Sequence, residues 1–242
     1  MKSSLVSTTH FGKIAVVAIN RPESLNTLSV ETLKLLTVQL KELSQQSYIS
    51  AVVIGGVGQA FAAGADINEL LTLDSQKAVA FSELGKRLFD QIRSCPQIVI
   101  AAIDGYCMGG GLDLALSCDL RYGSSTTVLA HPGAKIGIVT GFGGTRRLPL
   151  ATSLSFSNQL FATATRIGAE EALKSRLIQD FNRSGTAVEL AMAKAELIAQ
   201  KSLKQIEKLK KVVYLVGETV GGCTVASRYL DLCKKAATDN PH

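Results

Sequence analysis

Two glycine-rich turns carry the strongest chemical signal in this sequence. The first reads Phe-Ala-Ala-Gly-Ala-Asp-Ile at residues 61–67, and the second reads Asp-Gly-Tyr-Cys-Met-Gly-Gly-Gly-Leu-Asp at residues 104–113. Each turn follows a short apolar segment and leads into a helical pattern. Such a turn leaves backbone N–H groups unpaired at a helix N-terminus, where they attract negative charge. Two of these turns facing each other would direct two N–H groups at one carbonyl oxygen, which is the arrangement of an oxyanion hole.

The elements that must position these turns are short buried strands alternating with helices. Continuous apolar runs predict strands that pair in parallel, at residues 14–19, 51–54 and 98–103. A leucine stripe of helical period follows Ser29, a suitable N-cap, and predicts a helix from residue 30 to residue 43. Further helices are predicted over residues 75–94, before a proline, and over residues 112–117. From residue 187 the pattern is helical, with segments 187–203, 204–216 and 223–235.

Composition limits the class of protein. The chain has 242 residues, 46% of them apolar, which suits one large domain with a substantial core. The formal net charge is +6, but aromatic residues make up only 5% and no zinc-ligand spacing or basic-aromatic stripe occurs. Nucleic acid is therefore not an expected partner. An anionic small substrate accounts for a basic surface equally well.

Cysteine use and hydropathy bear on the compartment. The five cysteines are odd in number and contain no Cys-x-x-Cys pair, so neither a disulfide framework nor a metal site is predicted. Residues 1–10 lack an apolar signal core, and no apolar run approaches the ~20 residues that span a bilayer. We therefore expect no membrane partner and a cytoplasmic location, or another reducing, soluble compartment.

Three further motifs complete an ordered set. They are Asn-Arg-Pro-Glu-Ser-Leu-Asn at residues 20–26, Cys-Asp at 118–119 and Gly-Gly-Thr-Arg-Arg-Leu at 143–148. Together with the two glycine-rich turns, and in this order, they make the chain resemble the crotonase (enoyl-CoA hydratase/isomerase) superfamily over roughly residues 11 to 180.

The resemblance implies an α/β fold, a crotonase-like spiral of repeated strand–strand–helix units with a C-terminal helical trimerisation segment. On this basis we divide the chain into a spiral core, residues 1–186, and a helical oligomerisation segment, residues 187–242. The expected assembly is a homotrimer or a homohexamer. Apolar positions along the helical tail, among them Leu209, Val213, Val216 and Leu230, would form the subunit contacts.

The resemblance also implies the parts of a site for an acyl-CoA thioester. It places the two oxyanion donors at the backbone N–H groups of Ala65 and Gly110. It places coenzyme A against five residues of the two neighbouring loops, Ser24, Leu25, Ala63, Asp66 and Ile67. Coenzyme A would enter as part of the substrate, so no tightly bound cofactor and no metal are expected.

The acid and base positions depart from the hydratase pattern. Enoyl-CoA hydratases use two glutamates around one water, with their pKa values set apart by their environments. The first position falls on Asp113, an acid one methylene shorter, which could instead only stabilise the helix dipole. The second falls on Gly133, so one carboxylate is missing. If the family geometry persists, a glutamate at residue 133 would restore that carboxylate and raise hydratase activity.

His131 is a candidate replacement for the missing group. If residues 131–133 are extended, the His131 and Gly133 side chains point to the same side, because strand side chains alternate. An imidazole titrates near neutral pH and can act as acid or base. The alternatives are a packing histidine, or an anion or water in the vacated space. Thr140 also falls near this site, with packing as its more ordinary role.

Two classes of function therefore remain open. The first is an enzyme that stabilises a thioester enolate, with Asp113 as the main acid or base. With one carboxylate, a double-bond shift is easier to support than hydration, which must also activate water. The second is a non-catalytic acyl-CoA-binding protein, or a partner in a hetero-oligomer with an active relative. Loss of the second carboxylate is the main support for this alternative.

Overall fold

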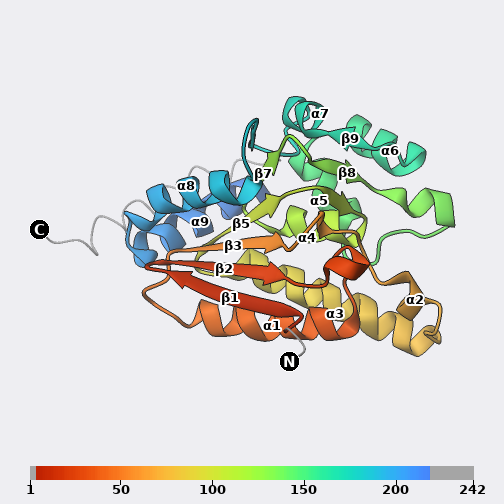
Figure 1. The fold of residues 1–242 in the computed structure, drawn as a ribbon, viewed down its shortest axis with the longest axis horizontal. Helices are drawn as coiled ribbons and strands as arrows, with labels where there is room; N and C mark the ends of the chain where they lie inside the picture. Colours follow the sequence, from red (N-terminus) through yellow and green to blue (C-terminus); the bar gives the residue numbers. More distant parts are fainter. Residues whose placement is uncertain (1–3, 219–242) are drawn as a thin grey trace, which may run out of the picture.

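The computed structural model of the chain describes residues 4–218 (Figure 1). The last predicted helix, residues 223–235, lies outside the described residues. A six-stranded sheet forms the centre, in the order β1 (Val6–Phe11), β2 (Ile14–Ile19), β3 (Ala51–Gly56), β5 (Ile98–Ile103), β7 (Leu120–Ser124) and β10 (Asp180–Asn182). All neighbours pair in parallel except β1 and β2. The three predicted strands and their parallel pairing are therefore confirmed.

A second, smaller sheet lies beside the first. It contains β4 (Ala60–Ala62), β6 (Tyr106–Met108), β8 (Val128–Ala130) and β9 (Ile167–Gly168). Each turn of the chain adds one strand to the large sheet, one to the small sheet and then a helix, as in β3–β4–α3 and β5–β6–α4. The predicted spiral of strand–strand–helix units is confirmed. Its consequence is that the ends of β4 and β6, from which the two glycine-rich turns emerge, are neighbours in one sheet.

The predicted helices that fall within the described residues are all present. The helices found there are α1 (Val30–Ser44), α2 (Ile67–Leu70), α3 (Ser75–Ser94), α4 (Gly110–Ser117), α5 (Gly144–Ala151), α6 (Leu154–Thr163), α7 (Ala169–Lys174), α8 (Ala187–Ala199) and α9 (Leu203–Glu218). Of these, α2, α5, α6 and α7 are additional to the prediction. Ser29 accepts a hydrogen bond from the Thr32 N–H at 3.1 Å and is the N-cap of α1, as predicted. By contrast, α4 begins at Gly110 rather than at residue 112, because the glycine triplet itself forms the first turn.

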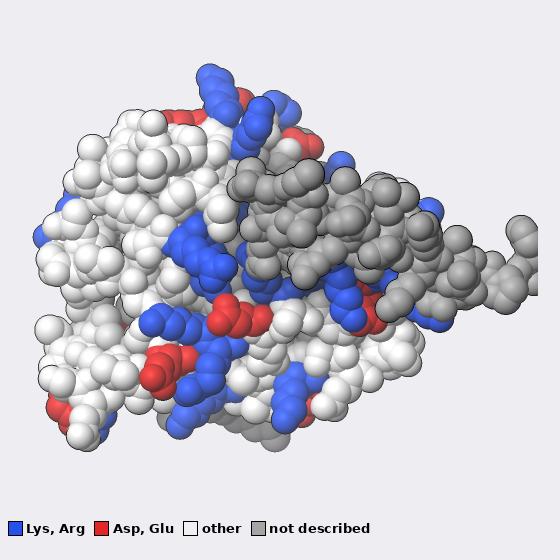
Figure 2. Space-filling model, turned by 180° about the vertical axis from the view of Figure 1, so that it is seen from behind, with Lys and Arg blue, Asp and Glu red and all other residues white. Residues whose placement is uncertain are grey.

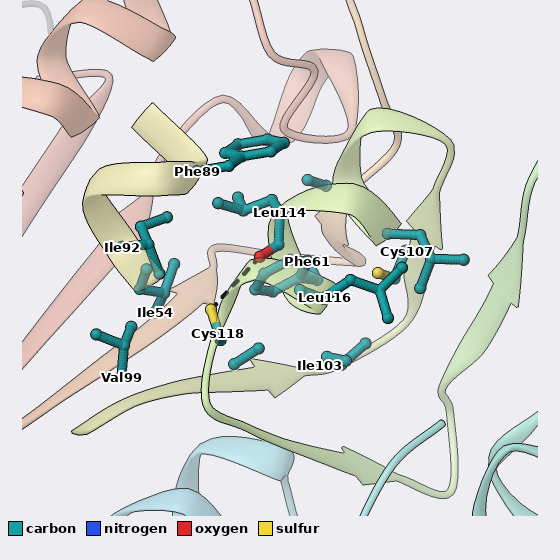
Figure 3. Packing of buried hydrophobic residues seen from close by; sticks show 14 of the residues in the cluster. Ile54, Phe61, Phe89, Ile92, Val99, Ile103, Cys107, Leu114, Leu116 and Cys118 are labelled. Atoms are coloured by element: carbon teal, nitrogen blue, oxygen red, sulfur yellow. Dashed lines mark hydrogen bonds between the residues drawn. The ribbon is translucent and has the colours of Figure 1, made fainter. Parts of the chain in front are cut away.

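The main core fills the space between the large sheet and helices α1, α3 and α4. Figure 3 shows Phe89 and Ile92 of α3 pointing toward Leu114 of α4. The strands are apolar on both faces because both faces are covered, as is usual in parallel sheets. On the opposite face the cover is α8, which lays the small side chains Ala187, Ala191 and Ala195 on the sheet. Part of the predicted oligomerisation segment thus completes the core of its own chain.

A buried ion pair docks α9 onto the sheet. The Lys210 ammonium donates to the Asp119 carboxylate at 2.7 Å and to the Gln97 carbonyl at 3.0 Å. The Tyr214 hydroxyl donates to the other Asp119 oxygen at 2.5 Å, and the Val99 N–H also reaches this carboxylate, at 2.8 Å. The Lys210 and Asp119 side chains are only 6% and 9% exposed. The Cys-Asp motif therefore serves the fold, by tying the helical tail to the core.

We predict that Lys210→Met lowers the free energy of unfolding by about 3 kcal/mol, because it leaves a buried carboxylate without its counter-charge. Lys211→Met is the matched control. Lys211 pairs with Glu207 on the exposed side of the same helix, and such surface pairs contribute below about 1 kcal/mol. Urea unfolding followed by circular dichroism measures both variants. Equal stability of the two variants would contradict the assigned role of Lys210.

Candidate functional site

The two glycine-rich turns bring a pair of backbone N–H groups together. A Cβ placed on Gly110 would lie 3.4 Å from the Ala65 nitrogen, and one on Gly64 would lie 3.5 Å from the Gly110 nitrogen. Neither the Ala65 N–H nor the Gly110 N–H donates a hydrogen bond to another residue within 4–218. Gly110 is also the first residue of α4, where the helix dipole adds to the positive potential. Two adjacent free donors of this kind can bind one carbonyl oxygen.

The second turn depends on glycine at two positions. Gly109 has φ +49° and ψ −116°, a conformation that residues with a Cβ rarely adopt. A Cβ on Gly111 would lie 2.0 Å from the Ala62 carbonyl oxygen, so α4 can begin against β4 only without a side chain there. The close approach of the two turns, and with it the spacing of the two N–H groups, follows from these glycines.

An ion pair fastens the first turn to the loop of residues 20–26. The Arg21 guanidinium donates to the Asp66 carboxylate at 3.1 Å, and the Thr27 hydroxyl donates to the same oxygen at 3.3 Å. Asp66 also caps α2 by accepting from the Glu69 N–H. Burial raises the pKa of Asp66, but the bonds from Arg21, Glu69 and Thr27 outweigh it, so the pKa lies below its ordinary value. The Asp66 side chain is therefore committed to structure. Its backbone is paired as well, since its N–H donates to the Leu28 carbonyl at 3.3 Å and its carbonyl accepts from the Leu70 N–H at 2.9 Å.

Asn26 organises this loop and was not singled out from the sequence. It is fully buried in the left-handed conformation, with φ +57°. Its side-chain oxygen accepts from the Arg21 N–H at 2.8 Å, and its amide donates to the Val57 and Ala60 carbonyls at 2.9 and 2.6 Å. The signal that could have found it is its place at the end of the Asn-Arg-Pro-Glu-Ser-Leu-Asn motif, since asparagine tolerates this conformation better than most residues.

The other predicted coenzyme A residues lie on these same loops, two of them exposed and two half-buried. Leu25 and Ile67 are 38% and 53% exposed, although both are apolar. The Ala63 N–H donates to the Leu25 carbonyl at 3.0 Å, and the Ser24 hydroxyl donates to the Arg21 carbonyl. A groove of about 990 Å³ lies on the same loops, and of the five predicted residues only Asp66 lines it. The predicted contacts are thus linked to one another by the Leu25–Ala63 hydrogen bond, but they do not all line this groove.

Asp113 is fully buried and carries two hydrogen bonds. One carboxylate oxygen lies 3.1 Å from His131 Nε2, and the other accepts from the Thr140 hydroxyl. The carboxylate also lies against the first residue of α5, because a Cβ on Gly144 would be 1.8 Å from its nearer oxygen. A helix N-terminus and two hydrogen-bond donors suit a negative charge. Thr140, a weak candidate in the sequence, is thus a direct partner of Asp113.

His131 reaches Asp113 for a reason other than the expected one. Residues Pro132–Ile136 form a 3-10 helix, not an extended segment, so the expected strand-like alternation of side chains is wrong. His131 precedes this helix, is 3% exposed and stacks against Phe161 with ring centroids 4.6 Å apart. The imidazole therefore contacts the buried Asp113 carboxylate and can fix the orientation of that carboxylate.

Gly133 has no room for the carboxylate that hydratases carry there. A Cβ at this position would lie 2.2 Å from the Ile138 carbonyl oxygen, which belongs to backbone and cannot rotate away. The Gly133 carbonyl itself accepts from the Ile138 N–H at 2.9 Å, which closes this turn. The expectation that a glutamate at residue 133 would restore hydratase activity is therefore wrong for this backbone, because the side chain cannot be added without opening the turn.

The described residues offer little for metal or thiol chemistry. No group of three His, Cys, Asp or Glu side chains that could hold a metal ion occurs within residues 4–218. Cys95, Cys107 and Cys118 are buried and unpaired with one another. Burial raises the pKa of Cys107 well above its usual value and that of Cys118 to about 12, so both thiols stay protonated and unreactive. In the same part of the chain, no helix is long and apolar enough to cross a bilayer.

Comparison with known proteins places the chain in a family. Residues 10–219 match the model of the enoyl-CoA hydratase/isomerase family. The chain belongs to this family, and so to the crotonase superfamily. A short-chain-enoyl-CoA hydratase of Clostridium acetobutylicum is 38% identical over 185 residues, which cover 74% of this chain and 71% of the relative.

Solved structures support the same membership at the level of the fold. DspI of Pseudomonas aeruginosa matches with a TM-score of 0.90 at 28% identity, covering 98% of this chain and 88% of that one. An enoyl-CoA hydratase from Thermoplasma volcanium also gives 0.90, at 29% identity, covering 99% and 94%. The spiral core is therefore a feature that this member of the enoyl-CoA hydratase/isomerase family shares with a known fold.

In this family member, Gly144→Ala should displace Asp113, because the added methyl group would overlap its carboxylate. We predict a loss of about 1–3 kcal/mol in the free energy of unfolding, typical of an overpacked core. Gly168→Ala is the matched control, since a Cβ there meets nothing within 4 Å. Urea titration of both variants provides the measurement. The prediction fails if Gly144→Ala is as stable as Gly168→Ala.

Proposed function

We propose that the chain is an enzyme that converts an acyl-CoA thioester through its enolate. The backbone N–H groups of Ala65 and Gly110 would hold the thioester oxygen, and Asp113 would carry the proton. The observation that supports this most directly is the pair of free N–H groups placed near a buried, hydrogen-bonded carboxylate. Each such donor typically stabilises an oxyanionic transition state by about 3 kcal/mol. The names of the relatives, which are enoyl-CoA hydratases, favour an acyl-CoA substrate.

A shift of a double bond fits the site better than hydration. Asp113, as a carboxylate, would take one proton from a carbon next to the double bond, and the electron pair would move onto the thioester oxygen as an enolate. The same proton would then return to a different carbon, so no atom is gained or lost. Hydration needs a second group to activate water, and Gly133 supplies none. A missing general acid or base typically costs 10²–10⁴-fold in rate.

His131 and Thr140 would act as positioning residues. Each occupies one oxygen of Asp113, but a carboxylate has about four acceptor sites, so about two remain, and one of them can take a substrate proton. Ser24 and Leu25 with the segment around Ala63, Asp66 and Ile67 would contact the coenzyme A part of the substrate. This assignment needs no tightly bound cofactor, and a reducing compartment suits the free cysteines.

The central prediction concerns Asp113. Asp113→Asn keeps the shape of the side chain but removes its proton-accepting charge, so turnover should fall at least about 10²-fold while the affinity for acyl-CoA persists. The assay is absorbance of the thioester with crotonyl-CoA, a 3-enoyl-CoA and a dienoyl-CoA, and calorimetry measures binding. Asp180→Asn, the same change on strand β10, serves as the matched control.

The outcomes separate the candidate functions. Fast hydration of crotonyl-CoA by the unchanged protein would contradict the preference for isomerisation. An Asp113→Asn variant as active as its parent would remove Asp113 from the mechanism and make His131 the first residue to test. Tight binding of acyl-CoA without turnover of any thioester would favour the non-catalytic alternative. No binding heat with millimolar acyl-CoA would refute both.

We also propose that the protein assembles as a homotrimer or homohexamer through its helical tail. Leu209 and Val213 of α9 are 62% and 59% exposed, and Leu197 of α8 is 59% exposed. Large apolar side chains that stay exposed in one chain are typical of subunit contacts when they lie together. Val216 and Leu230, named above for the same contacts, lie outside the described side chains.

We therefore predict that light scattering gives the mass of three or six chains at micromolar concentration. Leu209→Glu together with Val213→Glu should weaken the assembly, because both changes place charge on the proposed contact. Glu substitutions at the exposed positions Lys204 and Lys208 provide a control on the same helix. A monomeric mass for the unchanged protein would refute the proposal.

A further inference from the structure

Phe142 occupies the space beside the proposed oxyanion hole. Its side chain is 3% exposed and lies among aromatic rings of α3, with centroids 5.2 Å from Phe81 and 5.5 Å from Phe89. The residue belongs to the loop between the 3-10 helix and α5, far along the chain from either glycine-rich turn. Nothing in the mechanism proposed above uses this ring.

Two glycines fit the opposite edges of the Phe142 ring. A Cβ on Gly85 of α3 would lie 2.3 Å from the Cδ1 atom, and a Cβ on Gly110 of α4 would lie 3.0 Å from the Cδ2 and Cε2 atoms. The ring therefore spans the whole gap between α3 and the N-terminus of α4. Gly110 is also one of the two proposed N–H donors. A group bound to the Gly110 N–H would therefore lie in contact with the Phe142 ring.

The backbone of Phe142 is fixed to the catalytic side of the site. Its N–H donates to the Thr140 hydroxyl at 3.3 Å, and Thr140 in turn donates to Asp113. Its carbonyl accepts from Arg147 at 2.7 Å, and Arg147 is held by Asp90 of α3 at 2.8 Å. The backbone of Phe142 is thus held at both its N–H and its carbonyl, and its ring is packed on both edges. We therefore treat the ring as a fixed wall of the site.

Behind the ring lies a cavity of about 740 Å³ between α3, α5 and α9. Its lining includes Phe142 itself and is rich in cationic side chains, among them Lys86, Arg146 and Lys211. Lysine and arginine side chains also gather on the face that Figure 2 shows. A carbon chain that passed the ring would thus find space, but largely among charged side chains.

We infer that Phe142 limits the length of the acyl group, so that the enzyme accepts short acyl chains and excludes long ones from the cavity behind the ring. This inference rests on the proposed function, because it takes the thioester oxygen to lie at Ala65 and Gly110. The carbons beyond the reacting centre then start between the Gly110 donor and Asp113, where the ring blocks further extension. The ring limits the length by its shape, and the charged lining of the cavity beyond it offers a longer acyl chain little apolar contact.

The test compares butyryl-CoA with octanoyl-CoA by calorimetry, because these saturated thioesters bind without reacting across a double bond. The unchanged protein should bind octanoyl-CoA no more tightly than butyryl-CoA. Phe142→Ala should bind octanoyl-CoA on the order of tenfold more tightly than butyryl-CoA, since the space that the ring leaves beside Phe81 and Phe89 can bury about two methylenes and each contributes about fourfold. Leu150→Ala is the matched control, because it enlarges the same cavity without touching the wall.

Two further variants keep the test decisive. Phe142→Leu preserves more of the core and replaces Phe142→Ala if that variant does not fold. It should give the same change in relative affinity to a smaller degree. Gly85→Ala should push the ring toward Gly110 and weaken butyryl-CoA as well. An unchanged ratio of the two affinities in folded Phe142 variants overturns the inference, as does an unchanged protein that already prefers octanoyl-CoA. If no variant binds either thioester, the proposed function fails instead.

Discussion

The close approach of β4 to the start of α4 is the constraint on which the rest of the site depends. Gly111 lies so near the Ala62 carbonyl that no side chain fits between them. This contact sets the distance between the two glycine-rich turns and therefore between the N–H groups of Ala65 and Gly110. It exists because the spiral places β4 and β6 side by side, so that the two turns leave neighbouring strands at the same edge.

The remaining polar contacts hold this arrangement from both sides. Arg21, Asp66 and Asn26 fasten the first turn to the loop before α1, and Asn26 also binds the Val57 and Ala60 carbonyls just before that turn. His131 and Thr140 hold the Asp113 carboxylate under the N-terminus of α5. A buried polar network costs stability when one member is unpaired, so its complete pairing makes the site rigid. Rigidity is what preorganised donors require.

The absence of a second carboxylate is a property of the backbone and not only of one residue. The turn at residues 133–138 closes so tightly that a side chain at Gly133 would strike the Ile138 carbonyl. One substitution cannot convert this site into a two-carboxylate site, because the whole turn would have to open. The same loop continues to Phe142, so the segment that removes the second carboxylate also brings the ring against Gly110. The same loop thus determines both the missing carboxylate and the proposed limit on acyl length.

The sequence by itself determined the elements and the glycine-rich turns, because hydrophobic period, capping and glycine placement act over a few neighbouring residues. Ser29 as the cap of α1, the strand–strand–helix order and the apolar parallel strands all follow from such local signals. The pairing of His131 with Asp113, the crowding at Gly133 and the place of the Phe142 ring were decided only by the tertiary structure. Each joins segments far apart in the chain, and their contact depends on how the helices dock. A local pattern does not contain that docking geometry.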